Sequence, residues 1–354
     1  MNKTGSVTFC LILLLLFTSN PFAFGQEYRD IVPDDIVKLP NDLYHRKEYR
    51  VQWWYFTGHL QDSSGREFGY ELTFFVAGVQ KKEYKSSFGT NNIYISHFAI
   101  SDISGKKYFY ADAADNGAFG FAGAEEDRLK VWVGDDSLEG QPGEMRIRGR
   151  EGNTWIDLRL VPAKKIVLNG VEGYSRKSEE SALISSLYFS YTNMETEGSL
   201  GINGSEFRVK GKSWFDREIS SRGLAENYSG WDWFSLQLDD SREVMIYMIR
   251  KKDGSIDNFS SGTFVYPDGE YRHLRKDDFS VKILKHYTSK KTGARYPSQW
   301  KITIPAESIE VTITPMLEDQ EFLGTYSTWN YYWEGACRIE GTAHGKAYVE
   351  MTGY

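Results

Sequence analysis

The chain has 354 residues, which is long for a single domain and favours two domains of ordinary size. Its 42 Lys and Arg stand against 49 Asp and Glu, a formal net charge of −7 without a basic stretch, so a nucleic-acid partner is not expected. Aromatic residues reach 15 %, and together with 33 Gly and 9 Pro this composition favours strands and turns over helices.

The N-terminus has the pattern of a secretory signal. Val7–Phe17 forms a short apolar core, and Ala23 and Gly25 place small residues before a cleavage site. We therefore expect residues 1–25 to be removed and the protein to be exported, to the periplasm or exterior of a bacterial cell; an uncleaved anchor is the alternative. Cleavage would leave Cys337 as the only cysteine, so no intramolecular disulfide is expected. No transmembrane segment is expected after the signal.

After a polar lead-in, strand-length runs alternate with Gly, Asp or Asn. Helix signals are weak, and residues 176–186 are the best candidate for a loop or short helix. This pattern predicts an all-β fold built as an antiparallel meander, whose closure into barrels would remove exposed sheet edges. The predicted strands run over Val51–Leu60, Phe68–Val76, Ile93–Ile100, Lys107–Ala111, Leu129–Val133, Glu144–Arg150, Thr154–Val161, Phe207–Asp216, Trp231–Leu238, Val244–Arg250, Gly262–Tyr266, Phe279–His286, Trp300–Ile304, Ile309–Pro315, Tyr331–Glu340 and Gly345–Thr352.

An internal repeat relates the two halves. Trp53–Asp62 (WWYFTGHLQD) aligns with Trp231–Asp240 (WDWFSLQLDD), about half the chain away, with Trp, Phe, Leu and Asp in common. Chance similarity between two aromatic strands is the alternative. Duplication of one β-barrel module accounts for both the spacing and the length, and it predicts tandem barrels over residues 26–200 and 201–354.

Several kinds of catalytic site are not indicated. No HxH or HExxH spacing occurs, and there is no G-x-S-x-G elbow, Walker loop or G-x-G-x-x-G before a helix. Metal, nucleotide and serine-triad chemistry are therefore not expected, and neither is a cofactor. The six histidines are scattered at His45, His59, His97, His273, His286 and His344.

The segment Gly211–Asp240 is the densest concentration of Trp and Asp in the chain. In a strand, Trp214, Asp216 and Glu218 share one face and Arg217 points to the other. Aromatic walls beside carboxylates suit a dry pocket in which a proton donor acts on an apolar ligand. They also suit an ordinary sheet core with an ion pair at its rim.

In the following strand, Asp232 lies with Phe234 and Leu236 on an apolar face, where a carboxylate is costly to ionise. Either a cation such as Arg217 pairs with it, or its pKa rises and it stays protonated. A protonated acid beside tryptophans is a candidate proton donor to a carbon–carbon double bond, because the ring faces would stabilise the resulting carbocation. The alternative is that Asp216, Arg217 and Asp232 form a buried network that closes one barrel end.

Other strand residues carry weaker signals. His59 and His97 are lone strand histidines, which usually have structural roles, although either would also suit a pocket wall. Glu71 is interpreted as a structural carboxylate, and Glu334 and Glu350 are candidates for ion pairs with arginine.

Over nearly all of Gln52–Tyr354 the chain resembles the carotenoid 1,2-hydratase (hydroxyneurosporene synthase, CrtC) and AttH-like family. The motifs that carry the resemblance are QWWYFTGHL (52–60), FGYELTFF (68–75), HFAISD (97–102), GYSRK (173–177), WFDREIS (214–220), GWDWFSLQLDD (230–240), YWEGA (332–336) and YVEMTGY (348–354). The resemblance implies two lipocalin-like barrels in tandem and a hydrophobic ligand. In the hydratase branch it implies addition of water to the terminal double bond of an acyclic carotenoid.

Two features modify this expectation. The family's usual Glu before the paired Trp is Gln52 here, which removes one candidate acid from the first barrel. The motifs at 214–220 and 230–240 look more like the AttH-like branch, which is exported and often associated with ABC transport systems.

The leading hypothesis is an exported, hydratase-like protein that binds a hydrophobic, isoprenoid-type ligand. Asp216 or Asp232 would protonate the alkene, and Arg217 and Glu218 would orient the acid. The alternatives are a non-catalytic lipid carrier or accessory protein of an ABC transporter, and a glycan-binding β protein. The expected substrate-binding residues are Trp54, Tyr55, His97, Trp214, Trp231 and Trp233.

Overall fold

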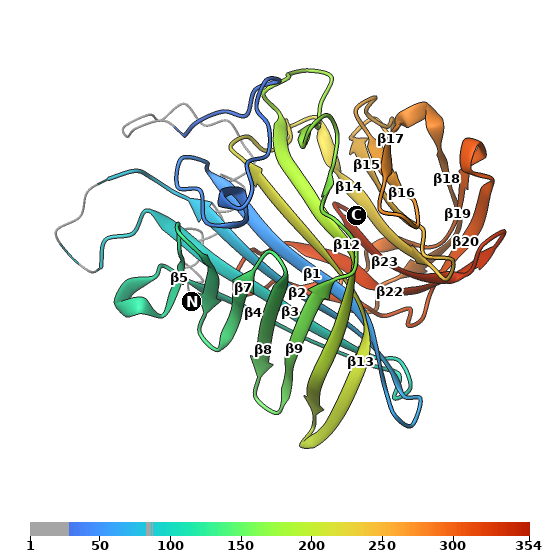
Figure 1. Ribbon diagram of the computed structural model, residues 1–354, viewed down its shortest axis with the longest axis horizontal. Helices are drawn as coiled ribbons and strands as arrows, with labels where there is room; N and C mark the ends of the chain where they lie inside the picture. Colours follow the sequence, from blue (N-terminus) through green and yellow to red (C-terminus); the bar gives the residue numbers. More distant parts are fainter. Residues whose placement is uncertain (1–27, 83–85, 87) are drawn as a thin grey trace, which may run out of the picture.

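The computed structural model describes residues 28–82, 86 and 88–354 and consists of two antiparallel β-sheets (Figure 1). A thirteen-stranded sheet curls into a nearly closed barrel, and a ten-stranded sheet forms a half-barrel beside it. The predicted all-β fold of two lipocalin-like sheets is thus confirmed, with the second barrel left open. The predicted signal at residues 1–25 lies outside the described residues and stays a prediction.

The first sheet has the strand order β4-β3-β2-β1-β13-β12-β9-β8-β7-β6-β5, and β10 and β11 also pair with β12. Its strands are β1 (Val51–Asp62), β2 (Glu67–Gly78), β3 (Asn92–Asp102), β4 (Lys107–Asp115), β5 (Ala122–Ala124), β6 (Leu129–Val133), β7 (Asp136–Gln141), β8 (Glu144–Glu151), β9 (Thr154–Pro162), β10 (Val167–Leu168), β11 (Tyr174–Arg176), β12 (Ser185–Ile202) and β13 (Ser205–Ser220).

The second sheet has the order β17-β16-β15-β14-β23-β22-β20-β19-β18, and β21 pairs with β22. Its strands are β14 (Tyr228–Leu238), β15 (Glu243–Lys251), β16 (Ser261–Val265), β17 (Tyr271–Arg275), β18 (Ser280–Thr288), β19 (Arg295–Ile304), β20 (Ile309–Pro315), β21 (Glu321–Leu323), β22 (Tyr331–Gly341) and β23 (Gly345–Thr352). Helical structure in the described part is limited to the short 3₁₀ turns η1 (Asn41–Leu43), η2 (Ala118–Gly120), η3 (Lys276–Asp278) and η4 (Pro305–Glu307).

The two segments of the predicted repeat occupy equivalent places. Strand β1 lies between the next strand, β2, and the last strand of its sheet, β13. Strand β14 likewise lies between β15 and the last strand, β23. The change of sheet comes after Ser220, later than the predicted boundary at 200, because β12 and β13 complete the first barrel.

Period-two alternation gives each of these strands two apolar faces. In β1, Trp54 and Phe56 point into the first barrel, whereas Trp53 and Tyr55 face the second sheet. The strand can be apolar on both sides because one face fills the barrel and the other packs on its neighbour. Gly58 is required by the tight packing, because a Cβ there would lie 2.5 Å from the Tyr70 ring.

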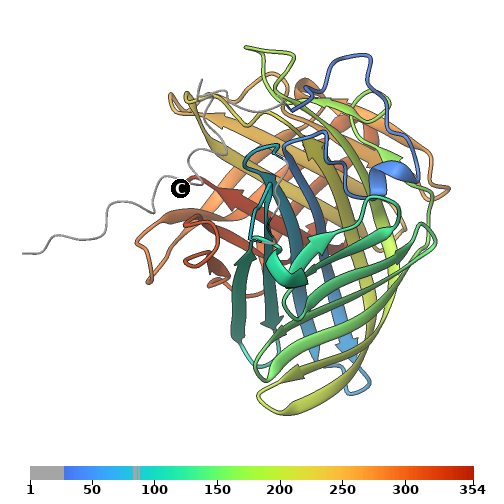
Figure 2. The same ribbon diagram turned by 90° about the vertical axis from the view of Figure 1, so that its left-hand side faces the viewer.

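The two sheets pack outer face against outer face. The contact involves β12, β13, β1, β2 and β3 of the first sheet and β15, β14, β23 and β22 of the second. Each barrel therefore has its own core, and a third apolar cluster lies between the sheets. Figure 2 shows the strands of the first sheet in front, with the orange and red strands of the second behind them. No helix among the described residues has the length and hydrophobicity that a membrane span requires.

Candidate functional site

The face between the two sheets collects most of the residues that the sequence analysis selected. On β13, Trp214, Asp216 and Glu218 point toward the second sheet, as the alternation predicts. On β14, Trp231 and Trp233 point back toward the first sheet. We call the region around Asp216, Tyr55, Tyr188 and Trp233 the inter-sheet site.

Asp216 is the buried acid of this site and accepts three hydrogen bonds. Its Oδ2 accepts from the Tyr188 hydroxyl at 2.6 Å, and its Oδ1 accepts from the Ser190 hydroxyl at 2.5 Å and the Trp214 indole at 2.7 Å. The Trp233 indole donates to the Tyr188 oxygen at 3.0 Å. Burial raises the pKa of Asp216 to about 7, although these donors favour the ionised form. Asp216 can therefore gain or lose a proton near neutral pH.

The aromatic rings around Asp216 are fixed by edge-on packing. The Tyr55 ring packs against Trp233 with centroids 5.1 Å apart at 84°, and Trp214 packs against Trp233 at 6.1 Å and 82°. All three side chains are buried. Rigid ring faces and edges beside a carboxyl group are suited to an apolar ligand whose reacting carbon becomes positively charged.

Lys177 supplies the positive charge beside Asp216. Its Nζ lies 3.1 Å from the Glu218 carboxylate, and it lies over the rings of Tyr188 at 4.7 Å and Tyr247 at 4.0 Å. Glu218 therefore has an ion-pair partner on the same face as Asp216. This partner comes from the loop between β11 and β12, the segment that the sequence predicted as a loop or short helix.

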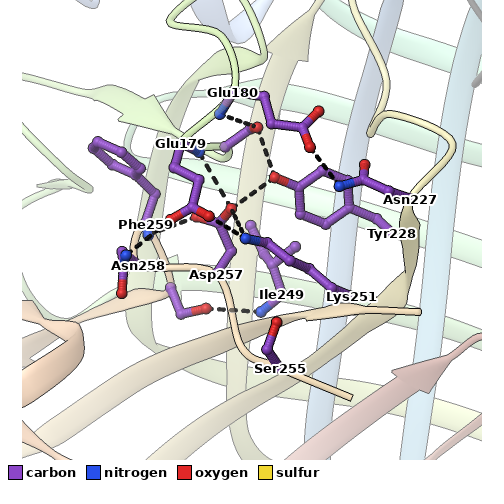
Figure 3. A network of polar contacts seen from close by, with 12 residues as sticks. Glu179, Glu180, Asn227, Tyr228, Ile249, Lys251, Ser255, Asp257, Asn258 and Phe259 are labelled. Carbon is purple, nitrogen blue, oxygen red and sulfur yellow. Dashed lines mark hydrogen bonds and ion pairs between the residues drawn. The ribbon is translucent and has the colours of Figure 1, made fainter. Parts of the chain in front are cut away.

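The loop that carries Lys177 is fastened to the second sheet by a polar network around Asp257 (Figure 3). Asp257 is fully buried and accepts from the Tyr228 hydroxyl at 2.6 Å and from the backbone N–H of Glu179 at 3.2 Å. Lys251 lies 3.7 Å from Asp257 and also pairs with Glu179. Because this network joins the loop to β14 and β15, it fixes where Lys177 enters the inter-sheet site.

Three further carboxyl groups, Glu71, Glu334 and Glu350, lie on the same inter-sheet face. Glu334 and Glu350 are directly opposite each other on β22 and β23. Tyr55 donates a hydrogen bond to Glu334, and the Thr73 hydroxyl donates to Glu71 at 2.6 Å. The other oxygen of Glu71 is buried and has no hydrogen-bond partner among the described residues.

None of these three glutamates forms an ion pair with a described residue, so their charges oppose one another. Burial raises the pKa of Glu334 well above its ordinary value, and Glu71 and Glu350 raise it further. Burial likewise raises the pKa of Glu71, and it raises that of Glu350 to about 7, with Asp216 adding to the shift. Burial and mutual repulsion both raise these pKa values, so the group favours a protonated carboxyl.

This second acidic group was not among the predicted site residues. Glu71 was predicted to be structural, and Glu334 and Glu350 were candidates for arginine ion pairs that do not form among the described residues. One signal was present, because Trp214-x-Asp216 and Tyr348-x-Glu350 share an aromatic-x-acid pattern in the last strand of each sheet.

Asp232 is placed away from this site, contrary to its predicted role as an alternative proton donor to Asp216. It points into the second half-barrel, where Arg250 lies 3.1 Å from Oδ1 and the Tyr354 hydroxyl donates at 2.9 Å. The alternation explains the placement, since Asp232 shares its strand face with Phe234 rather than with Trp233.

Arg217 and Trp54 also lie on the inner face, in the first barrel. Arg217 is fully buried, stacks on Trp54 at 3.9 Å and donates to the side-chain oxygen of Gln52 at 2.8 Å and to backbone carbonyls. It therefore does not orient Asp216, and Trp54 does not line the inter-sheet site. The predicted network of Asp216, Arg217 and Asp232 is not formed.

His97 faces the second sheet but is fully engaged there. Its Nδ1 lies 2.8 Å from the Tyr332 hydroxyl, its Nε2 lies 3.0 Å from the Ser327 hydroxyl, and its ring stacks on Phe322 at 4.7 Å. Burial lowers the pKa of His97 to about 4, so the ring is neutral. These contacts fit the structural role that lone strand histidines usually have.

The inter-sheet site reaches the surface at one edge. Trp53, Phe75, Trp231 and Glu350 are each half-buried there, whereas Asp216 is only 4 % exposed. A separate cavity of about 260 Å³ lies near β4 and includes none of these residues; it is lined by Phe98, Tyr108, Phe109, Tyr110, Glu151 and Thr154. Within the described ranges, no group of His, Cys, Asp and Glu is arranged to hold a metal ion.

Solved structures share this architecture. A candidate AttH protein from Nitrosomonas europaea is 29 % identical, with a TM-score of 0.84 over 92 % of this chain and 99 % of that one. Kievitone hydratase from Nectria haematococca is 16 % identical, with a TM-score of 0.71 over 93 % and 97 % of the two chains. CghA with Sch210972 is 10 % identical, with a TM-score of 0.55 and the same coverage. For these last two the likeness concerns the fold alone.

No curated protein matches the sequence significantly. The AttH-like family model, by contrast, matches residues 30–354, which includes both sheets and the whole inter-sheet site. The chain therefore belongs to the AttH-like family.

Proposed function

We propose that this protein is a hydratase-like enzyme that adds water to a carbon–carbon double bond of a hydrophobic, isoprenoid-type ligand in the inter-sheet site. The observation that carries the proposal is Asp216, a buried carboxyl group with a pKa raised to about 7, enclosed by Trp214, Trp233 and Tyr55. A general acid is most effective when its pKa lies near the working pH. Kievitone hydratase and CghA share the fold of this chain, which is consistent with chemistry at such a site.

In the proposed reaction, Asp216 gives its proton to the alkene through the Tyr188 hydroxyl. Tyr188 is placed for this relay because it lies 2.6 Å from Asp216 and accepts from the Trp233 indole, which would stabilise negative charge on its oxygen. The tertiary carbocation is held against the tryptophan and tyrosine rings. Water then adds to the cation, and loss of one water proton gives the neutral alcohol.

The isoprenoid substrate class is supported by the aromatic lining and by the resemblance to carotenoid hydratases. Trp53, Phe75 and Trp231 at the exposed edge would contact an apolar chain while its terminal double bond reaches the buried Asp216. Lys177, held between Tyr188 and Tyr247, forms an ion pair with Glu218 on the same face as Asp216.

The test is to incubate the purified protein with lycopene or farnesol in water enriched in oxygen-18 and to search for labelled alcohol by mass spectrometry. Asp216→Asn is expected to lower turnover by about 10²-fold or more, the usual contribution of a general acid. Asp232→Asn is the matched control, because it neutralises an equally buried aspartate on the other face of its sheet. Equal turnover by Asp216→Asn and wild type would refute the proposal, whereas saturable binding without product would favour a lipid carrier.

A further inference from the structure

The strand pairings relate Asp216 to a second residue across the interface. Asp216 of β13 pairs with Tyr55 of β1, and Glu350 of β23 pairs with Trp233 of β14. In the internal repeat Tyr55 corresponds to Trp233, so Asp216 and Glu350 hold equivalent positions in the two sheets. Both point into the space between the sheets, from opposite sides.

The two equivalent carboxyl groups have different surroundings. Asp216 is 4 % exposed and is surrounded by three hydrogen-bond donors. Glu350 is half-buried at the edge where the site meets solvent, next to Trp231, and it faces Glu334 on the neighbouring strand. Asp216 is thus the more deeply buried of the two, and Glu350 lies nearer the exposed edge of the site.

The carboxyl groups close to Glu350 leave one acceptor unpaired. Glu334 accepts a hydrogen bond from Tyr55, and Glu71 across the interface has a buried oxygen without a partner among the described residues. A buried, unpaired carboxyl oxygen is costly unless a ligand or water satisfies it. Glu71 is 1 % exposed and Glu334 is 2 % exposed, so that partner would be held between the sheets.

We infer that Glu350 is the base that takes the proton from the attacking water, as the counterpart of Asp216 in the second sheet. This inference rests on the proposed function and assigns its second proton transfer. Glu334 and Glu71, which favour their protonated forms, would hydrogen-bond the water and keep Glu350 as the ionised member of the group. The roles differ because protonation of a carbon needs a dry acid, whereas deprotonation of water needs a group that water can reach.

The proton balance closes over one turnover. Asp216 loses a proton to the alkene carbon, and the water oxygen forms a bond to the resulting tertiary cation. Glu350 takes one proton from that oxygen and leaves the alcohol. Glu350 then releases its proton at the exposed edge, and Asp216 regains one, so no oxidant, reductant or metal takes part.

The experiment separates protonation of the alkene from capture by water. A cation that is not captured loses a proton again, so in deuterium oxide it returns as deuterated or double-bond-isomerised alkene. With the lycopene or farnesol that the wild type hydrates, Glu350→Gln is expected to lower alcohol formation about 10²-fold or more. It should leave deuterated or isomerised alkene at or above the wild-type amount. Asp216→Asn should lose both products.

Melting temperature and tryptophan fluorescence establish that each variant is folded, and Glu350→Asp, which keeps a carboxyl group, should recover part of the alcohol formation. The inference is overturned if folded Glu350→Gln hydrates like wild type, or if it loses both products as Asp216→Asn does. If the wild-type protein forms neither alcohol nor exchanged alkene, the proposed function itself fails, and the role of Glu350 fails with it.

Discussion

Replacing Asp216 by Asn should make the protein more stable at alkaline pH. The folded protein holds the Asp216 proton up to about pH 7, whereas an unfolded carboxyl group loses it near the ordinary pKa of 3.8. The folded state therefore binds more protons between these two values, and the free energy of unfolding falls as the pH rises through that window. Asn cannot ionise, so the variant escapes this loss.

The magnitude follows from the two pKa values. At about 1.4 kcal/mol for each pKa unit, the difference corresponds to about 4 kcal/mol once the pH exceeds 7, as an upper bound. The hydrogen bonds can be kept, because the Asn oxygen can accept from Trp214 and Ser190 while its NH₂ donates to the Tyr188 oxygen. Removing the Asp216 charge also removes its repulsion of Glu350, which stabilises the variant further at alkaline pH.

Urea unfolding followed by tryptophan fluorescence at pH 5 and pH 8.5 measures the effect. The free energy of unfolding of Asp216→Asn minus that of wild type should rise by up to about 2.7 kcal/mol between the two pH values, because only the two pH units from pH 5 to about 7 lie within the assay. Asp232→Asn serves as a control, because it leaves the Arg250 charge without its partner and should destabilise at pH 8.5. A difference that is independent of pH, or that falls as the pH rises, would refute the argument for a buried, proton-holding Asp216.

Two further predictions concern residues that hold the site in place. Arg217→Met should lower the free energy of unfolding by about 3 kcal/mol or more, because it removes the donor to the backbone carbonyls of Asp42 and Tyr44 at η1. A loss below about 1 kcal/mol in urea unfolding would contradict this role. Tyr228→Phe removes the hydroxyl that donates to buried Asp257 at 2.6 Å, so it should lower the free energy of unfolding by about 1–3 kcal/mol. Tyr271→Phe, at a half-buried position, is the control. An unchanged melting temperature of Tyr228→Phe would show that the network does not fasten the loop.

Local patterns were sufficient for much of the fold. Alternation in Phe207–Asp216 and Trp231–Leu238 predicted both strands, and it correctly placed Asp216 with Trp214 and Asp232 with Phe234. This succeeds because the side-chain period of a strand is a local property. The repeat also located β1 and β14 at equivalent places, since each begins one copy of the same meander.

The candidate site was only partly predictable, because alternation does not say which face of a strand lies inside a barrel and which lies against a neighbour. Asp232 was therefore grouped with Asp216, although the two face different cores. Glu350 was missed because the spacing along the chain between Asp216 and Glu350 differs from the spacing between Trp53 and Trp231. The first sheet has more strands between its first and last members than the second, so a search at one spacing does not align them.

The amino-acid sequence by itself determined the strands, the faces of their side chains and the duplication, because these depend on residue period and local backbone preference. Only the tertiary structure decided that the outer faces of the two sheets meet. That contact brings Asp216 and Glu350, which lie far apart in the chain, close together on facing sides of the interface. The raised pKa values follow from the same contact, since each carboxyl group is desolvated by the sheet that packs against its own.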